Sequence, residues 1–301
     1  AIGLATFVFA VLLGVPFTII PQTLFTSLDS FSYITIPLFI LVGNLMETGG
    51  LSKRIVAFAS SLCKKVPGSL GSIMVVASAF FGAISGSASA TTASIGGMMV
   101  PSMLERGYSK GYAGALAAVS GTLGAIIPPS IVMIIYAIAA EVSVTDMFIS
   151  GFFPGIMIAL ILIIVNTVYS VVTHVDAVDK NARFSWKEVG QTFWDAKWAL
   201  LTPVIILGGI YSGIFTATEC AVVAAVYSLI VGFFLHKELT FKSLITILGK
   251  TCRTVGAVLI IVPMAIALGK LLTLSMAPVY IGQWAVSLTD NPNIIILIVV
   301  F

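Results

Sequence analysis

Residues 80–92 read Phe80-Phe81-Gly82-Ala83-Ile84-Ser85-Gly86-Ser87-Ala88-Ser89-Ala90-Thr91-Thr92, a run of small hydroxyl and glycine residues that interrupts an apolar segment in its middle. Lipid tolerates irregular backbone at membrane depth only where that backbone is buried in protein or lines a polar cavity. This run therefore predicts part of a binding site inside a membrane protein, and not a wall helix that faces lipid.

The composition around this run is that of a multi-pass, all-α membrane protein. The 301 residues are 59% hydrophobic and only 9% charged, which leaves too little charge to cover a soluble domain of this size. The net charge is +3, but the sequence has no basic patch with interleaved aromatic residues, so no nucleic-acid partner is expected. Spanning helices need about 20 apolar residues each, and we expect them over residues 1–20, 31–46, 112–140, 148–173, 199–215, 218–235 and 254–272. Helices at the membrane surface are expected over residues 51–62, 184–198, 241–248 and 275–288.

The charges predict that segment 68–104 enters and leaves the membrane on one side. Lys and Arg concentrate in cytoplasmic loops, so the polar stretch 174–197, with Lys180 and Arg183, is placed in the cytoplasm. Following the expected helices backward puts Arg106 on the same side, and if Lys64 and Lys65 are cytoplasmic as well, both ends of the segment lie on that side. Each arm, 70–84 and 91–104, covers about 22 Å at 1.5 Å per residue, short of the roughly 30 Å hydrocarbon core. These features predict a re-entrant helical hairpin whose tip is the hydroxyl run.

A second interruption lies inside the expected helix 112–140, in the stretch Ser120-Gly121-Thr122-Leu123-Gly124-Ala125-Ile126-Ile127-Pro128-Pro129-Ser130. Two consecutive prolines remove two N–H donors and clash with the preceding turn, and residues before proline leave the helical region. The helix is therefore expected to break here. A hairpin tip next to a broken helix is typical of secondary transporters.

Six motifs, in order along the chain, resemble the large membrane subunit of the tripartite ATP-independent periplasmic (TRAP) transporters. They are Ile36-Pro37-Leu38-Phe39-Ile40-Leu41-Val42-Gly43-Asn44-Leu45-Met46, the stretch from Phe80 to Gly97, Glu105-Arg106-Gly107-Tyr108, Gly121 to Ser130, Phe153-Pro154-Gly155, and residues 208–219. Together they cover nearly the whole chain.

The resemblance implies a sodium-coupled importer of small organic anions in the bacterial cytoplasmic (inner) membrane, with no other cofactor. Sialic acid, C4-dicarboxylates and 2-oxo acids are the substrates known for the family. Family members work with a small four-helix membrane subunit and a periplasmic solute-binding protein. They are thought to use an elevator motion, and their fold has two inverted repeats.

The same resemblance implies a division of the chain into scaffold and moving parts. Residues 1–65 would hold scaffold helices and an interfacial arm, and 66–147 the first half of the transport domain. Residues 148–253 would return to the scaffold with a cytoplasmic amphipathic loop, and 254–301 would begin the second transport repeat. A second hairpin would start near Asn293, with its tip beyond Phe301, so the chain is expected to be a fragment.

Sodium is a hard cation that prefers oxygen ligands, and we expect one sodium site between the two breaks. The candidate ligands are Ser85, Gly86, Ser87 and Ser89 at the tip, and Gly121, Thr122, Gly124 and Pro128 in the broken helix. Helix N-termini favour anions, so the substrate is expected beside Ser87, Thr91, Thr92, Pro129 and Ser130. The alternatives are that the small residues serve only close packing and that the proline pair is a simple kink.

The acidic residues favour sodium over proton coupling, because none is expected at the centre of a span. Asp176 is interpreted as a loop residue, and Glu47 as a solvated residue at a helix end. Thr216 and Glu219 have the spacing of a capping box.

Three other functions are weighed against this reading. A membrane enzyme would need an Asp pair, a Ser/His dyad or a metal motif at depth, and none is visible, so no enzyme is expected. A carrier of similar architecture that works without a binding protein is the main alternative, and a channel is a weaker one.

Overall fold

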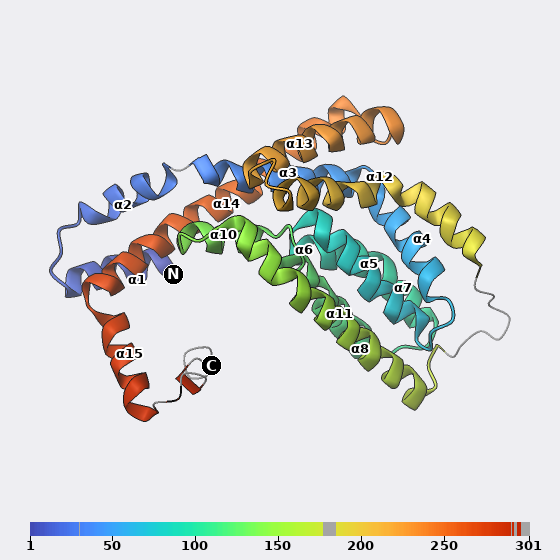
Figure 1. Cartoon of the computed structure of the whole chain (residues 1–301), viewed down its shortest axis with the longest axis horizontal. Coiled ribbons are helices and arrows are strands. Elements are labelled where there is room, and N and C mark those ends of the chain that lie inside the picture. Colours follow the sequence, from blue (N-terminus) through green and yellow to red (C-terminus); the bar gives the residue numbers. More distant parts are fainter. Residues whose placement is uncertain (30, 177–184, 290, 292–293, 296–301) are drawn as a thin grey trace. The chain divides into compact units, whose positions relative to one another are not determined.

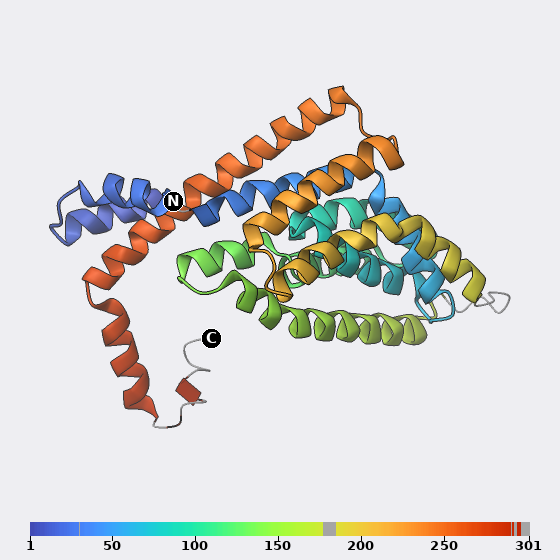
Figure 2. The ribbon, with the colours of Figure 1, turned by 45° about the horizontal axis from the view of Figure 1, so that its top comes forward.

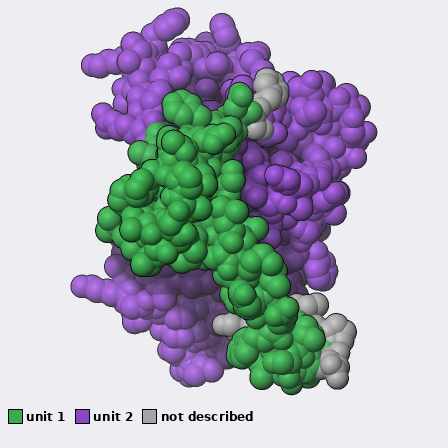
Figure 3. All heavy atoms as spheres, turned by 90° about the vertical axis from the view of Figure 1, so that its left-hand side faces the viewer, with its two compact units in different colours: residues 1–30, 256–301 green, residues 31–255 purple. Residues whose placement is uncertain are grey.

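The computed structural model describes residues 1–29, 31–176, 185–289, 291 and 294–295, and every regular element among them is helical (Figure 1). The chain forms two compact units, one of residues 31–255 and one of residues 1–30 with 256–301, coloured separately in Figure 3. The first unit holds both interruptions seen in the sequence. The predicted cytoplasmic residues 177–184, with Lys180 and Arg183, and the predicted start of a second hairpin at Asn293 lie outside the described residues.

The helices of the first unit are η1 (Phe31–Ile34), α3 (Thr35–Thr48), α4 (Leu51–Cys63), α5 (Ser69–Ser85), α6 (Ala88–Thr91), the π-helical η2 (Thr92–Gly96), α7 (Gly97–Glu105), α8 (Lys110–Gly121), α9 (Leu123–Ile126), α10 (Ile131–Ala139), α11 (Val144–Thr173), α12 (Trp186–Tyr211), α13 (Ala217–Ile230), η3 (Val231–Leu235) and the first part of α14 (Phe241–Leu274). The second unit holds α1 (Ile2–Leu12), α2 (Ile19–Leu28), the remainder of α14 and α15 (Ala277–Leu288).

Four described helical segments are long and apolar enough to cross a membrane. They are α11, α12, Ala217–Leu235 (α13 with η3) and α14. In addition, Lys110–Ile126 and Ile131–Ala139 meet the same criterion as a pair that bends by 47°. This bend lies at Pro128–Pro129, so the predicted break of the helix is confirmed.

The predicted hairpin is confirmed, because both of its ends meet at one buried carboxylate. Asp176, whose side chain is 1% exposed, accepts hydrogen bonds from the Leu70 N–H (2.9 Å) and from Arg106 (3.4 Å). Tyr108 also donates to it, and burial together with the nearby carboxylate raises the pKa of Tyr108 above its ordinary value. Asp176 is therefore a loop residue, as expected, but it anchors the base of the hairpin.

Helix α11 lies along the first arm of the hairpin (Figures 1 and 2). The buried Asn166 amide donates to the Gly68 carbonyl (2.7 Å) and to Ser72 Oγ (3.1 Å). A side chain on Gly71 would overlap Asn166. The small residues at the start of α5 thus let two helices approach closely.

Three expected helix boundaries are wrong. The segment 1–20 is not one helix, because α1 ends at Leu12 and α2 starts at Ile19; between them Gly14 adopts φ +63° and Pro16 lacks an N–H. The segments predicted over 184–198 and 199–215 are joined in the single helix α12, which covers Trp186–Tyr211. Those predicted over 241–248 and 254–272 are joined in the single helix α14. A change of polarity along a helix does not interrupt it when no proline or left-handed residue lies at the change.

Other helices match the sequence closely. Helix α11 covers the predicted span 148–173, and α13 with η3 covers 218–235. Helices also form at the predicted surface segments 51–62 and 275–288. The capping box is confirmed: the Thr216 N–H donates to Glu219 Oε2 (2.8 Å), and the Glu219 N–H donates to Thr216 Oγ1 (3.3 Å).

Candidate functional site

The tip of the hairpin is a tight reversal between α5 and α6. Helix α5 ends at Ser85, and Gly86 adopts φ +62°, a left-handed conformation that only glycine enters without strain. Ser87 is extended and caps α6, where its Oγ accepts the Ala90 N–H at 3.4 Å. The sequence Ser-Gly-Ser therefore ends one arm, turns the chain and starts the next.

Hydroxyl and carbonyl oxygens gather within this reversal. Thr91 Oγ1 donates to the Ser87 carbonyl oxygen (2.8 Å) and lies 3.1 Å from Ser85 Oγ. Ser87 Oγ lies 3.1 Å from Ser89 Oγ. Ser85 and Thr91 are buried, Ser87 is half-buried and Ser89 is exposed. The tip thus presents several oxygens of the kind that a hard cation prefers.

The break in the second helix is built from extended residues around two prolines. Helix α9 ends at Ile126, Ile127 is extended, and Ser130 is extended and caps α10. The Ser130 hydroxyl donates to the Ala125 carbonyl (2.6 Å), and its oxygen accepts the Met133 N–H (3.4 Å). Ser130 therefore satisfies backbone groups on both sides of the break.

A backbone hydrogen bond joins the break to the hairpin tip. The Ile131 N–H donates to the Gly86 carbonyl oxygen at 3.1 Å. A Cβ on Gly86 would lie 2.8 Å from the Pro129 carbonyl oxygen. Two interruptions that are about 45 residues apart in the sequence thus meet in the fold, as a shared site requires.

Glycines in the broken helix make this contact close. A Cβ on Gly124 would overlap Thr91 Oγ1 and lie 2.8 Å from the Ser87 carbonyl oxygen. A Cβ on Gly121 would overlap Thr92 Oγ1. Close packing is therefore one role of these glycines, and it brings their backbone beside the oxygens of the tip.

Two of the predicted residues, Thr122 and Pro128, make no side-chain hydrogen bond to the tip among the described residues. The Thr122 hydroxyl is exposed and donates to the Val119 carbonyl of its own helix at 2.7 Å. Pro128 is buried beside the break, and the hydrogen bond between break and tip is made by Ile131, three residues later. The Thr122 carbonyl in turn accepts the Ala125 N–H at 2.9 Å, so both oxygens of Thr122 make local contacts within the broken helix.

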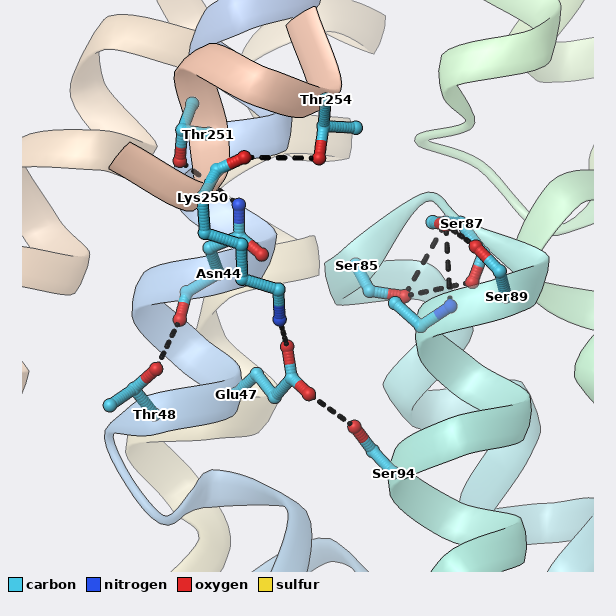
Figure 4. A network of polar contacts seen from close by, with 11 residues as sticks. Asn44, Glu47, Thr48, Ser85, Ser87, Ser89, Ser94, Lys250, Thr251 and Thr254 are labelled. Atoms are coloured by element: carbon cyan, nitrogen blue, oxygen red, sulfur yellow. Dashed lines mark hydrogen bonds and ion pairs between the residues drawn. The ribbon is translucent and has the colours of Figure 1, made fainter. Parts of the chain in front are cut away.

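A cavity of about 250 Å³ adjoins the tip (Figure 4). It lies between α3, the hairpin tip, the start of α10 and α14. Its lining residues are Ile40, Gly43, Asn44, Glu47, Ser85, Ser87, Ser89, Ala90, Ala93, Ile131, Lys250 and Thr254. The cavity therefore joins the hydroxyl tip to a pair of charged residues.

The charged pair closes one side of this cavity. Lys250 Nζ lies 2.7 Å from Glu47 Oε2, and the Ser94 hydroxyl donates to Glu47 Oε1 at 3.0 Å. One turn before Glu47, Asn44 Nδ2 donates to Thr251 Oγ1 at 2.9 Å. Figure 4 shows the two polar pairs between α3 and α14, with Ser94 reaching in from the hairpin.

Glu47 is partly solvated, with its side chain 26% exposed, but it also has partners on two other helices. Glu47 lies near the end of α3, where a charge normally reaches water, and Lys250 lies 203 positions away. The sequence does contain a signal for this contact, namely polar residues spaced along two otherwise apolar helices. Asn44 and Glu47 share one face of α3, and Lys250, Thr251 and Thr254 lie within about one turn of α14.

The donor set suits an oxygen-ligated ion. Among the residues that the structure describes, no group of three or more His, Cys, Asp or Glu side chains could hold a metal ion. The oxygens that the two breaks bring together are hydroxyls and backbone carbonyls, which are ligands for hard cations.

Comparison with known proteins identifies the family. Residues 1–301 match the family described as tripartite ATP-independent periplasmic transporter, DctM component. The chain is 37% identical over 99% of its length to the isethionate TRAP transporter permease protein DctMQ of Oleidesulfovibrio alaskensis, of which it covers 47%. It is 35% identical over 92% of its length to the sialic acid TRAP transporter permease protein SiaT of Haemophilus influenzae, of which it covers 45%.

A third relative gives the same result. The chain is 37% identical over 92% of its length to the C4-dicarboxylate TRAP transporter large permease protein DctM of Pseudomonas aeruginosa, of which it covers 64%. The chain thus spans about half to two thirds of the length of these relatives. It belongs to the DctM component family of the tripartite ATP-independent periplasmic transporters.

Proposed function

We propose that the protein carries out sodium-coupled import of small organic anions, chiefly carboxylates, across the bacterial inner membrane. The observation that carries this proposal is the hydrogen bond between the Gly86 carbonyl and the Ile131 N–H, at 3.1 Å. It supports one shared site between the hairpin tip and the broken helix. Because the chain belongs to a transporter family, the alternative that it is a membrane enzyme is not supported.

The substrate class follows from the names of the relatives and from the charge of the cavity. Isethionate, sialic acid and C4-dicarboxylates, which name three relatives, are all organic anions. Lys250 is the only basic residue that lines the described cavity. We assign it the role of attracting the anionic group of the substrate, which would then compete with Glu47 for the ammonium.

Sodium is assigned to the oxygens between the breaks. The assigned ligands are Ser85, Gly86, Ser87 and Ser89 with Gly121, Thr122, Gly124 and Pro128. The substrate would lie beside Ser87, Thr91, Thr92, Pro129 and Ser130, of which Ser87 lines the same cavity as Lys250. The close approach of Gly124 to Ser87 and Thr91 supports this grouping.

An elevator motion is the proposed mechanism. The tip and the break are joined by a backbone hydrogen bond and by glycine contacts too close for a side chain, so they suit a rigid body that carries the site. The second inverted repeat would complete the site. A periplasmic binding protein and a small four-helix membrane subunit are the proposed partners.

Uptake into proteoliposomes tests the proposal. The full-length protein would be reconstituted with its small subunit and binding protein, and radiolabelled organic acids supplied with an inward sodium gradient. We expect concentrative, saturable uptake that stops when potassium replaces sodium and when the binding protein is left out. Uptake without the binding protein would favour the independent carrier, and unsaturable, non-concentrative flux would favour a channel.

A further inference from the structure

A second cavity, of about 620 Å³, lies away from the hairpin tip. It is formed by α4, the first half of α12 and the turn between η3 and α14. Three cations line it, Lys53, Arg54 and Lys197, against two acids, Asp195 and Glu238. The cavity thus carries a surplus of positive charge.

The surplus resides in two lysines. Arg54 is paired with Glu238 at 2.8 Å. Neither Lys53 nor Lys197 forms an ion pair with any residue in the described part of the chain. Asp195 is exposed and so is partly solvated. Two ammonium groups are therefore available to an anionic ligand.

Tryptophans surround one of these lysines. Lys197 Nζ lies 3.3 Å from the centroid of the Trp194 ring and 5.0 Å from that of Trp198. Trp194 is 65% exposed. Tryptophan and lysine together are typical of the headgroup level of a membrane, where an indole combines an apolar ring with a polar N–H.

The same face of α12 continues as an apolar stripe. Leu201 and Val204 follow Lys197 at i+4 and i+7, the spacing of one helix face, and are 39% and 62% exposed. Helix α12 is long and apolar enough to cross a membrane. A ligand with an anionic head at Lys197 and a hydrocarbon chain along Leu201 and Val204 would match both parts.

We propose that this cavity binds the headgroup of an anionic phospholipid, whose phosphate contacts Lys53 and Lys197 and whose acyl chain follows Leu201 and Val204. The charge surplus and the apolar stripe carry the proposal together. A soluble anion would use only the first, and an apolar face of a partner protein only the second. The site is independent of the transport site, since the two cavities share no lining residue.

The test uses the full-length protein in nanodiscs of phosphatidylcholine doped with brominated phosphatidylglycerol or, separately, brominated phosphatidylcholine. Bromine quenches nearby tryptophan, so quenching reports lipid contact. We expect half-maximal quenching at lower amounts of phosphatidylglycerol than of phosphatidylcholine. The double variant Lys53→Gln/Lys197→Gln should reduce this preference about thirtyfold, since each of the two lysines near an anionic surface contributes about 1 kcal/mol. The matched control is Lys242→Gln, which changes an exposed lysine on α14 that does not line this cavity. This variant should keep the preference for phosphatidylglycerol.

Three results would overturn the proposal. Equal quenching by both lipids would show that charge is not recognised. An equal loss in Lys242→Gln would show a general surface effect. Abolition of the preference by millimolar inorganic phosphate would show a soluble-anion site. The assay is also repeated with the small membrane subunit added. If that subunit displaces the quenching lipid, the face binds a protein partner and the lipid proposal is overturned.

Discussion

Glu47 Oε2 lies 2.7 Å from Lys250 Nζ, and this ion pair joins the last turn of α3 to α14 beside the hairpin tip. The Glu47 side chain is 26% exposed and that of Lys250 is 56% exposed. The ammonium that would attract an anionic substrate therefore already has a carboxylate partner within the protein. The two charges should act on substrate binding in opposite directions.

The first prediction follows from this competition. Lys250→Gln should raise the KM for the organic anion, because the cavity loses its cation. Glu47→Gln should lower it, because Lys250 is released. Partly exposed ion pairs contribute about 1 kcal/mol or less, so each change should be about fivefold or smaller. Initial uptake rates over a series of substrate concentrations measure both, with Lys242→Gln as control. A purely structural pair would instead change KM in the same direction in both variants.

The second prediction separates two hydroxyls at the proposed sodium site. Ser87→Ala should raise the sodium concentration for half-maximal uptake about fivefold, as expected for the loss of one oxygen contact worth about 1 kcal/mol. Thr122→Ala should leave it unchanged, because that hydroxyl donates to Val119 and alanine keeps the carbonyl.

The control for Ser87→Ala removes a similar helix cap elsewhere. Ser143 caps α11 by accepting the Asp146 N–H at 3.3 Å. Ser143→Ala therefore removes an N-cap hydrogen bond comparable to the one that Ser87→Ala removes. Sodium titrations of uptake compare the three variants. An effect of Ser143→Ala or Thr122→Ala as large as that of Ser87→Ala would contradict the assignment.

The third prediction concerns the contact between tip and break. A methyl group at Gly124 would overlap Thr91 Oγ1 and approach the Ser87 carbonyl, so Gly124→Ala should separate them and abolish most of the uptake. Overpacking of this kind costs about 1–3 kcal/mol. Gly114→Ala, in α8, places its methyl group in open space and should be neutral or slightly stabilising. Thermal unfolding in detergent and uptake assays compare the two, and equal behaviour would show that the contact is unimportant.

The sequence was sufficient to predict the hairpin and the broken helix because both depend on local backbone constraints. Arms too short to span a membrane, a glycine between two serines and two adjacent prolines restrict the chain wherever they occur. Asp176 could be placed in a loop, but its contact with Leu70 spans 106 positions. The bond between Glu47 and Lys250 spans 203. Such pairs depend on tertiary packing, which a local pattern does not report.

The sequence predicts boundaries inside α12 and α14 that the structure does not contain, and the reason is related. Residues 184–198 and 241–248 are polar or amphipathic and the segments after them are apolar, so each pair was separated at the change in polarity. A helix continues through such a change when its backbone remains hydrogen-bonded. At residues 13–18, by contrast, Gly14 and Pro16 interrupt the backbone itself, and there the apolar pattern concealed a break.

The last prediction concerns pH and His236, which lies between η3 and α14 in the second cavity. Burial lowers the pKa of His236 below its ordinary value, and the nearby Arg54 lowers it further, whereas Glu238 partly opposes them. The folded protein therefore resists protonation of this imidazole, whereas the unfolded chain takes up the proton near pH 6.5. Stability should then decrease as the pH falls below about 6.5, because the unfolded state binds more protons there.

Apparent Tm values of the detergent-solubilised protein between pH 7.5 and 5.5 measure this dependence of stability on pH as a slope. His236→Gln, which keeps a polar side chain but cannot titrate, should flatten it, whereas the exposed His174→Gln should not. An unchanged slope in His236→Gln would assign the pH dependence to other groups.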